Sequence, residues 1–422
     1  MQSLNCELTY QSRSRAARKI YRRASPTEMV YMQTHTNVVS RSTITGAINR
    51  EQFDAAVACL EARYGILRAV VEDGQFMERT DNWQAVESWL SADRCSADVL
   101  YEKLLNAELD TRKKVYSIHV IAGDDTLDVF MLSTHAVTDA TSLVELHACL
   151  AYMCDCIVRG IAPAFETQPF PSPLDAAVSQ SLAALPADRM CDPIAYSGRF
   201  AKIPPRARVR QDGEPPRRRL ERTVIQFDAM QRIHAAAHAH GSSVHSLLLA
   251  AFALAIRDVA GEQPRQMLLR SSVDMRRRLE PHASPELVFT AITGLITRIP
   301  DLDRPFFDIA KLVFNDIHEG AANGSVFHTY LNYPKLFCGM QQPPVALNVS
   351  DMQAIRFRWP TQQLKVTGFD YACGLKNFPN VSVAIFDGLL VASTVYSDEF
   401  IDPAVMRAIS ENVVRRLESA CQ

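Results

Sequence analysis

The chain has 422 residues, more than the roughly 250–300 that one core accommodates, so two domains or two related halves are expected. Hydrophobic residues make up 47% and charged residues 22%, which excludes a disordered or fibrous protein. The net charge of −2 provides no overall field that would attract nucleic acid or an anionic membrane.

Membrane and secretory signals are weak. The longest apolar run, residues 247–256, is far shorter than the roughly 20 residues of a membrane-spanning helix, and no apolar leader is seen. Ten cysteines form no CxxC pair, which favours reduced thiols and no zinc site. A cytoplasmic location is expected. Six basic residues at positions 13–23 indicate a solvated arm, with a transit peptide as the alternative.

Proline density divides the chain. Ten prolines lie within residues 161–221, where locked φ angles favour an extended, irregular connection. We therefore expect a basic N-terminal arm over residues 1–24, a first subdomain over 25–160, a Pro/Arg-rich bridge over 161–221 and a second subdomain over 222–422.

The first half combines helix and strand patterns. Residues 51–64 place Phe53, Val57, Leu60 and Tyr64 on one helical face, and Asn49 precedes them as an N-cap with Gln52 three residues later. Residues 115–122 and 126–134 read as two strands joined by a short Gly-Asp-Asp loop, which predicts a hairpin.

The second half continues in the same mixed manner. Residues 228–240 and 246–259 predict two helices, because Gly241 stops the first and the following serines cap the second. Strands are expected at residues 267–273, 295–299, 345–349, 381–386 and 389–396. Asp387-Gly388 predicts a hairpin between the last two, and residues 403–420 predict a final helix. The fold class is therefore mixed α/β in two halves.

A histidine stands where a strand pattern meets a helix pattern. The apolar run 127–132 ends at Thr134-His135, and Thr141-Ser142 can cap a helix that buries Leu143 and Leu146. Rigid elements on both sides suit a general base, and Asp139 suits bonding to backbone amides or an arginine. The His-x-x-x-Asp pattern alone is short, and among 11 histidines it favours a merely structural role.

The surrounding residues resemble a known superfamily. Ser133 to Ser142 (STHAVTDATS) is similar to the HHxxxDG motif of condensation domains, chloramphenicol acetyltransferase, plant-type HxxxD acyltransferases and polyketide-associated acyltransferases. Further stretches agree in order: residues 24–28, 46–48, 62–68, 240–244, 247–254, 273–276 and 279–281. The closest resemblance is to the free-standing, polyketide-associated type.

This resemblance implies a V-shaped pair of chloramphenicol-acetyltransferase-like subdomains with a tunnel between them. It makes His135 the general base that deprotonates a hydroxyl or amine, which then attacks a thioester without forming an acyl-enzyme. Asp139 becomes a structural partner of Arg276 across the junction. Asn348 and Ser350 fall where such proteins place a polar contact to the oxyanion or substrate.

Three departures from the motifs stand out. Thr134 replaces the first histidine, and Ala140 replaces the glycine, adding a methyl group to the turn. Residues 369–374 (FDYACG) are at best a relic of the DFGWG motif. Unusual substrates or reduced activity are the two interpretations of these departures.

The predicted function is acyl transfer from a carrier-protein or coenzyme A thioester to a hydroxyl, forming an ester in polyketide, lipid or other secondary metabolism. Alternatives are a free-standing condensation domain that forms an amide, and a silent scaffold that binds a carrier protein. No bound cofactor is expected, since the thioester is a substrate, and a monomer without nucleic-acid or membrane partners is expected.

Two other clusters carry groups that could bind a ligand. Arginines between positions 206 and 222 suit docking of an acidic carrier protein or coenzyme A phosphates, but a solvated loop is the favoured interpretation. His234, His238, His240 and His245 suggest metal chelation, but they fit an ordinary helix pair better, and no metal is predicted. Rossmann, Walker A and GxSxG motifs are absent from the sequence.

Overall fold

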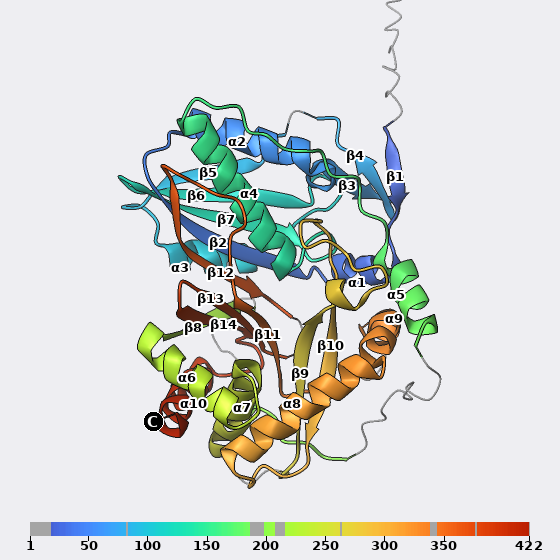
Figure 1. Cartoon of the computed structure of the whole chain (residues 1–422), viewed down its shortest axis with the longest axis vertical. Helices are drawn as coiled ribbons and strands as arrows, with labels where there is room; N and C mark the ends of the chain where they lie inside the picture. Colours follow the sequence, from blue (N-terminus) through green and yellow to red (C-terminus); the bar gives the residue numbers. More distant parts are fainter. Residues whose placement is uncertain are drawn as a thin grey trace, which may run out of the picture.

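The computed structural model describes residues 18–81, 83–185, 198–206, 216–261, 264–337, 344–375 and 378–421. These residues form two halves, each built around a sheet covered by helices, one above the other in Figure 1. The predicted mixed α/β class with two sheet-rich halves is confirmed.

The first half is built on a five-stranded sheet. Its elements are β1 (Ile20–Arg23), α1 (Pro26–Gln33), β2 (Asn37–Thr45), α2 (Arg50–Arg63), β3 (Ala69–Glu72), β4 (Gln75–Glu78), β5 (Val86–Ser91), α3 (Ala97–Leu105), β6 (Tyr116–Ala122), β7 (Thr126–Thr134) and α4 (Ala140–Val158). The large sheet has the order β12-β2-β7-β6-β5, and β1-β4-β3 form a small one. Side chains alternate along β7, so Val129 faces the core with α2 and α4, while Phe130 faces α3.

The second half is built on a six-stranded sheet. Its elements are α5 (Leu174–Ala183), β8 (Arg218–Ile225), α6 (Phe227–Ala239), α7 (Val244–Ala260), β9 (Met267–Asp274), β10 (Ile292–Ile299), α8 (Phe306–Ala322), α9 (Ser325–Phe337), β11 (Leu347–Ala354), β12 (Lys365–Cys373), β13 (Asn380–Phe386), β14 (Leu389–Ser397) and α10 (Pro403–Ala420). The strand order is β10-β9-β11-β13-β14-β8. Helix α7 is buried along almost its whole length, because it packs against the sheet, α8 and α10.

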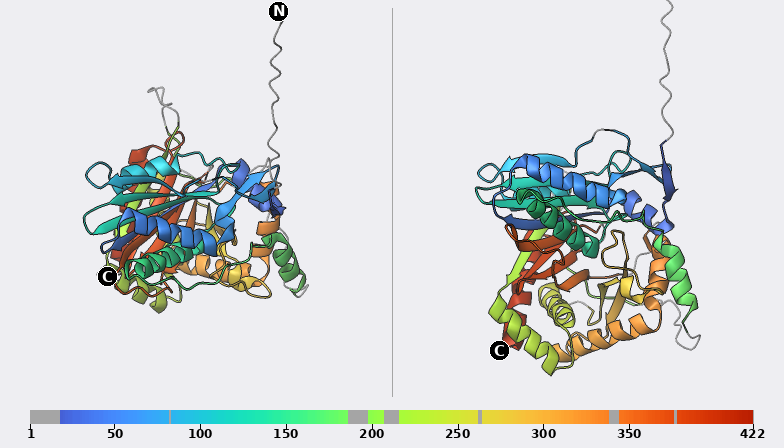
Figure 2. Two further views of the ribbon diagram at one scale, coloured as in Figure 1. Left: turned by 90° about the horizontal axis from the view of Figure 1, so that it is seen from above. Right: turned by 45° about the horizontal axis from the view of Figure 1, so that its top comes forward.

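One strand of the second half pairs with the sheet of the first. Strand β12 runs antiparallel to β2, with Lys365 opposite Thr45 and Cys373 opposite Val38. In Figures 1 and 2 this orange-red strand lies at the junction between the halves. The two halves therefore share an edge of continuous backbone hydrogen bonding.

Several predicted elements are confirmed. Helix α2 begins after Asn49 with a capping box to Gln52, and β6 and β7 form the predicted hairpin. Asp387 and Gly388 have φ angles of 49° and 78°, the left-handed pair that a tight hairpin between β13 and β14 requires. Helix α10 spans the predicted residues 403–420.

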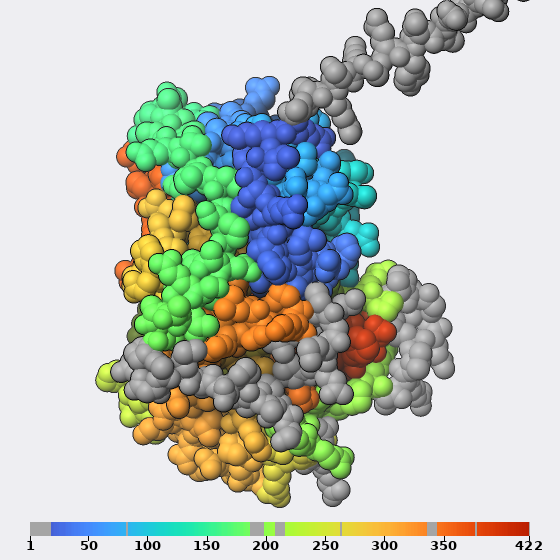
Figure 3. Space-filling model, turned by 90° about the vertical axis from the view of Figure 1, so that its right-hand side faces the viewer, coloured from blue at the N-terminus to red at the C-terminus, as the bar shows by residue number. Residues whose placement is uncertain are grey.

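The bridge is less irregular than predicted. Residues 174–183 form α5, which begins directly after Pro173, and β8 starts at Arg218 and pairs with β14. Proline is tolerated at a helix start, where the missing N–H has no partner to lose, so proline density did not exclude a helix here. Figure 3 shows this green segment lying over the junction, down to the orange of α9.

Part of the predicted basic arm belongs to the folded first half. Residues 20–23 form β1, which pairs with β4, and Arg22 forms an ion pair with Glu28 at 2.7 Å. A carboxylate partner and backbone pairing therefore order these residues, which charge alone did not predict. Residues 1–17 lie outside the described residues.

One helix has the composition of a membrane span. Helix α4 carries an 18-residue window with a mean hydropathy of 1.4, although 72% of that window is buried inside the fold. Its apolar surface is explained by the core of the first half, where Leu143 and Leu150 pack against β7 and α2.

Candidate active site

His135 lies between β7 and α4, where its ring lines a cavity of about 30 Å³ at the junction of the halves. Its Nδ1 lies 2.8 Å from the carbonyl oxygen of Thr138. Since a carbonyl oxygen only accepts, Nδ1 carries the proton and Nε2 keeps its lone pair. Burial lowers the pKa of His135, although the nearby Asp139 carboxylate opposes that effect. The imidazole is therefore a neutral base with a fixed tautomer.

Neighbours fix the position of this ring. The Tyr31 ring stacks on it with centroids 4.5 Å apart. The Thr290 hydroxyl donates to the His135 carbonyl at 2.5 Å, and the His135 amide donates to Thr36 at 2.8 Å. Backbone and ring are thus held from three sides, as catalysis by a positioned base requires.

Asp139 is the centre of a buried network. It caps α4 by accepting from the Ser142 amide at 2.9 Å, so the cap is Asp139 rather than the predicted Thr141-Ser142. Its carboxylate also accepts from Arg276 at 2.8 and 3.1 Å and from the Ala291 amide at 2.8 Å. Burial opposes ionisation, but these donors outweigh it and hold the pKa of Asp139 below its ordinary value.

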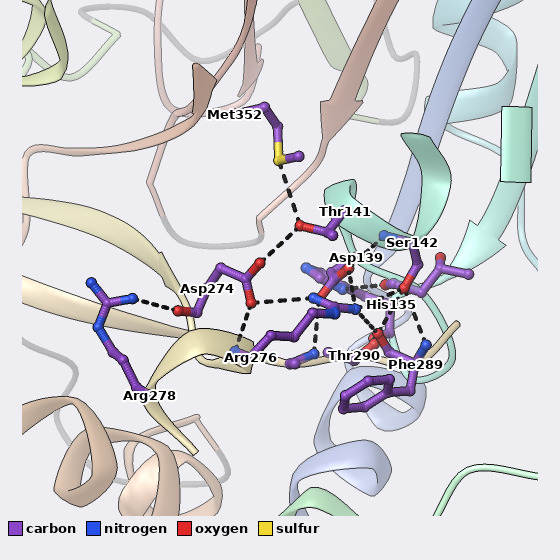
Figure 4. Close-up of polar contacts among 12 residues, drawn as sticks. His135, Asp139, Thr141, Ser142, Asp274, Arg276, Arg278, Phe289, Thr290 and Met352 are labelled. Atoms are coloured by element: carbon purple, nitrogen blue, oxygen red, sulfur yellow. Dashed lines mark hydrogen bonds and ion pairs between the residues drawn. The ribbon is translucent and has the colours of Figure 1, made fainter. Parts of the chain in front are cut away.

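Arg276 and residues 289–291 of the second half form hydrogen bonds to the turn from His135 to Asp139 and to Ser142, as Figure 4 shows. The Ser142 hydroxyl donates to the Phe289 carbonyl at 2.8 Å and accepts from the Phe289 amide at 3.1 Å. Arg276 donates to the same carbonyl at 2.7 Å, and its guanidinium lies over the Phe289 ring. Of its side-chain nitrogens, Nε alone lacks a partner among the described residues. We call residues 139, 142, 276 and 289–291 the seam.

Asn348 lies on the opposite wall of the His135 cavity, but its amide is already used. Its Nδ2 donates to Ser272 at 3.0 Å and to Asn380 at 2.5 Å, and its Oδ1 accepts from Arg270 at 2.8 Å. Because arginine can only donate, this orientation of the amide is fixed. No N–H of Asn348 remains for an oxyanion, which counts against the predicted contact.

Ser350 lines the same cavity and keeps a donor. Its hydroxyl oxygen lies 3.1 Å from the Tyr371 hydroxyl, which donates to the Ser350 carbonyl at 2.6 Å. The Ser350 hydroxyl proton has no acceptor among the described residues. Of the five predicted site residues, His135, Asn348 and Ser350 line the cavity, whereas Asp139 and Arg276 lie in the seam.

Sequence reasoning missed several cavity residues. Arg270 and Tyr31 line the cavity beside His135 without having been singled out, and Tyr333 lines it as well. Arg270 could have been noticed as a charge inside the otherwise apolar start of β9.

The motif departures have local explanations. The Thr134 hydroxyl accepts from the Ala136 amide at 3.4 Å within the turn. Ala140 is the first residue of α4, where helical backbone accommodates a methyl group, and it lines the cavity. The relic of the DFGWG motif lies in β12 and contributes Tyr371 to the cavity wall.

A second, larger hollow lies beside the seam. This cleft of about 1160 Å³ is lined by α4, the end of β9 and residues 351–358, and includes Arg276 but not His135. Ser272 lines both hollows. The exposed arginines Arg277, Arg356 and Arg358 stand on the cleft wall. At the junction, where a tunnel was predicted, the structure has a wide cleft and a small cavity with Ser272 on the wall of both.

The described bridge arginines and the histidine cluster do not line the His135 cavity. Among the described bridge arginines, Arg219 pairs with Asp398 and Arg222 with Asp98 and Asp370, so these charges are used within the fold. Arg208 and Arg210 lie outside the described residues. Of the histidine cluster, His240 stacks on Phe307, and the described residues contain no group of three or more metal-ligating side chains.

Comparisons with known proteins give one family match and a shared fold. Residues 214–382 match the family model described as phthiocerol/phthiodiolone dimycocerosyl transferase C-terminus. No curated protein matches the sequence. Polyketide synthase associated protein 5 from Mycobacterium tuberculosis has a TM-score of 0.71 at 15% identity, covering 94% of this chain and 98% of that chain.

Two further solved structures share the fold. The first condensation domain of the CDA synthetase has a TM-score of 0.70 at 14% identity, covering 96% of each chain. The trichothecene 15-O-acetyltransferase from Fusarium sporotrichioides has a TM-score of 0.66 at 13% identity, covering 95% of each chain. Over residues 214–382 the chain is thus similar to this transferase family, and its fold is similar to those of a polyketide synthase associated protein, a condensation domain and an acetyltransferase.

Proposed function

We propose that this protein transfers an acyl group from a coenzyme A or carrier-protein thioester to a hydroxyl acceptor, with His135 as general base. The observation that carries the proposal is the neutral, oriented imidazole in the cavity at the junction, with Nδ1 bonded to the Thr138 carbonyl and Nε2 free of partners among the described residues. A general base must hold its proton-accepting nitrogen toward the substrate, and this tautomer supplies it.

The chemistry is a direct transfer. Nε2 of His135 takes the acceptor's hydroxyl proton while the oxygen forms a bond to the thioester carbonyl carbon. The carbon–sulfur bond then breaks, and the thiolate leaves with the proton from the imidazolium. The Ser350 hydroxyl is the proposed donor to the intermediate oxyanion, in place of the occupied Asn348 amide.

A covalent acyl-enzyme is not required. The one cysteine on the cavity wall, Cys373, has its pKa raised by burial to about 12, so its thiol stays protonated at neutral pH. A protonated thiol is a poor nucleophile, which supports attack by the acceptor itself.

The wide cleft is the proposed donor site. Its exposed arginines, Arg277, Arg356 and Arg358, suit the phosphates of coenzyme A or of a carrier protein's phosphopantetheine. The pairing of the bridge arginines with Asp398 and Asp98 makes the bridge a weaker candidate for this role. The cytoplasmic location stays a prediction.

The test compares wild type with His135→Ala, using octanoyl-CoA and octanoyl carrier protein as donors and octan-1-ol as acceptor. Loss of the general base should lower turnover by about 10²–10⁴-fold. His234→Ala is the matched control, because that histidine is exposed on α6, away from the cavity. Full activity of a folded His135→Ala protein would refute the proposed mechanism.

A matched amine, octylamine, separates the acceptor classes. Acylation of octan-1-ol in preference to octylamine supports the ester-forming function. Acylation of octylamine alone would replace it with condensation-type amide formation. Binding of the carrier protein without transfer to either acceptor would indicate a scaffold, and His135→Ala would then leave that binding unchanged.

A further inference from the structure

Arg270 is a buried cation on the wall of the His135 cavity. It lies on β9, is 8% exposed, and donates from Nη1 to the Asn348 side-chain oxygen at 2.8 Å. Its guanidinium lies across Gly294 of β10, where any added Cβ would collide with it. Glycine at this position thus provides the space in which the cation lies beside the cavity.

No acid of the described chain balances this charge. Arg270 forms no ion pair with any described residue, and neither Asp nor Glu lines the cavity. A buried charge without a counter-charge is costly, and native proteins normally pair it. The Asn348 oxygen takes one of its N–H groups and leaves the others available for a ligand.

The unpaired cation is also unfavourable for His135. A general base becomes an imidazolium when it takes a proton, and a nearby guanidinium repels that charge. An anion bound at Arg270 would remove the repulsion at the moment of proton transfer. The structure is thus better matched to a site that contains a bound anion during the reaction.

We infer that the cavity beside His135 is a carboxylate-binding site, in which Arg270 pairs with a carboxylate on one of the two substrates. A guanidinium matches the two oxygens of a carboxylate, and a cavity of about 30 Å³ admits a group the size of one or two waters. The inference rests on the proposed transferase function and names its substrate class: an acidic acyl donor or an acidic acceptor.

Two matched pairs of compounds distinguish these sources. Adipoyl-CoA and hexanoyl-CoA share a six-carbon chain and differ in the terminal carboxylate, which tests the donor. The acceptors 3-hydroxyoctanoate and 3-hydroxyoctanamide share a chain and a hydroxyl, and only the first carries a carboxylate, which tests the acceptor. Dissociation constants are measured by calorimetry, so that discrimination is seen even if no transfer occurs, and kcat/KM is measured where it does.

Wild type should bind the carboxylate member of one pair more tightly, and Arg270→Met should reduce that preference about ten- to hundredfold. Arg270→Lys should restore part of it, because the positive charge remains. Gly294→Ala should weaken it by displacing the guanidinium without removing it. Arg298→Met, which removes an exposed arginine of β10 away from the cavity, is the control.

Equal binding of both members of both pairs by wild type would overturn the inference. An equal loss for acidic and neutral members in Arg270→Met would also overturn it, because that indicates a role in folding or positioning. Transfer of neutral groups without any carboxylate preference would leave the proposed transferase intact while refuting this site.

Discussion

Two buried arginines, Arg270 on β9 and Arg276 just after it, have very different surroundings. Arg276 is 1% exposed and lies against Asp139, the Ser142 hydroxyl and the Phe289 carbonyl. Arg270 is 8% exposed and faces a cavity without a carboxylate. A paired cation stabilises the architecture, whereas an unpaired cation beside a general base is suited to a ligand.

The same contrast separates the seam from the cavity wall. In the seam, carboxylate, hydroxyl and backbone groups bond to one another across the two halves. On the wall, Ser350 and Arg270 keep N–H or O–H groups that no described residue accepts. Substitutions in the seam should therefore act on stability, and substitutions on the wall should act on binding and turnover.

The largest effect on stability is expected from Asp139→Ala. It removes the buried carboxylate partner of Arg276 and leaves this cation only the partly exposed Asp274, at 3.3 Å, among the described acids, which should lower the free energy of unfolding by about 3–5 kcal/mol. Urea denaturation measures the change. The double variant with Arg276→Met should lose less than the sum of the two single variants, since no lone charge remains.

Asp402→Ala provides the reference for Asp139→Ala. Asp402 caps α10 by accepting from the Ala404 amide and pairs with no described arginine, so its loss should cost about 0.5–2 kcal/mol. If both substitutions cost the same, the seam ion pair contributes nothing beyond an ordinary helix cap.

A smaller effect is expected from Ser142→Ala. The hydroxyl bonds to both backbone groups of Phe289. Its loss should leave the buried Phe289 amide unpaired, while Arg276 still donates to the carbonyl, at a cost of about 1–3 kcal/mol. Thermal and urea unfolding should show this loss, whereas Ser179→Ala on the exposed face of α5 should change neither. A neutral Ser142→Ala would show that the seam tolerates missing contacts.

The smallest effect concerns pH. Burial lowers the pKa of His135 below 6.5 and Arg270 lowers it further, so the basic imidazole persists as the pH falls below 6.5. Removing the cation in Arg270→Met raises this pKa, which should move the acidic limb of kcat/KM to higher pH. Neutral substrates are used, so that no carboxylate masks Arg270. An unchanged limb would mean that Arg270 does not act on His135 electrostatically.

Local patterns predicted much of the fold. The capped helix α2, the β6–β7 hairpin and the Asp387-Gly388 turn depend on neighbours in sequence, and each was found where predicted. Helix α5 and strand β1 were missed, because each is ordered by contacts with distant residues, α9 and β4 respectively.

The site was predicted in part for the same reason. The Asp139–Arg276 pair followed from a resemblance of motifs, and the structure contains it. Residues 289–291 contact the turn mostly through backbone groups, which every residue type has. The sequence therefore could not indicate these contacts. The Asn348 amide is occupied by Arg270 on β9 and Asn380 on β13. The sequence does not show that these two strands lie on either side of β11.

The crossing of β12 has a consequence for how the chain could be divided. Residues 365–373 complete the edge of a sheet whose other strands end by residue 134, so the first half expressed alone would expose the unpaired edge of β2. Exposed edges of this kind recruit strands from other molecules and promote aggregation. Complementation by two separately produced fragments is therefore expected to succeed only when the second fragment supplies β12, and denaturation of the intact chain should occur as one cooperative transition.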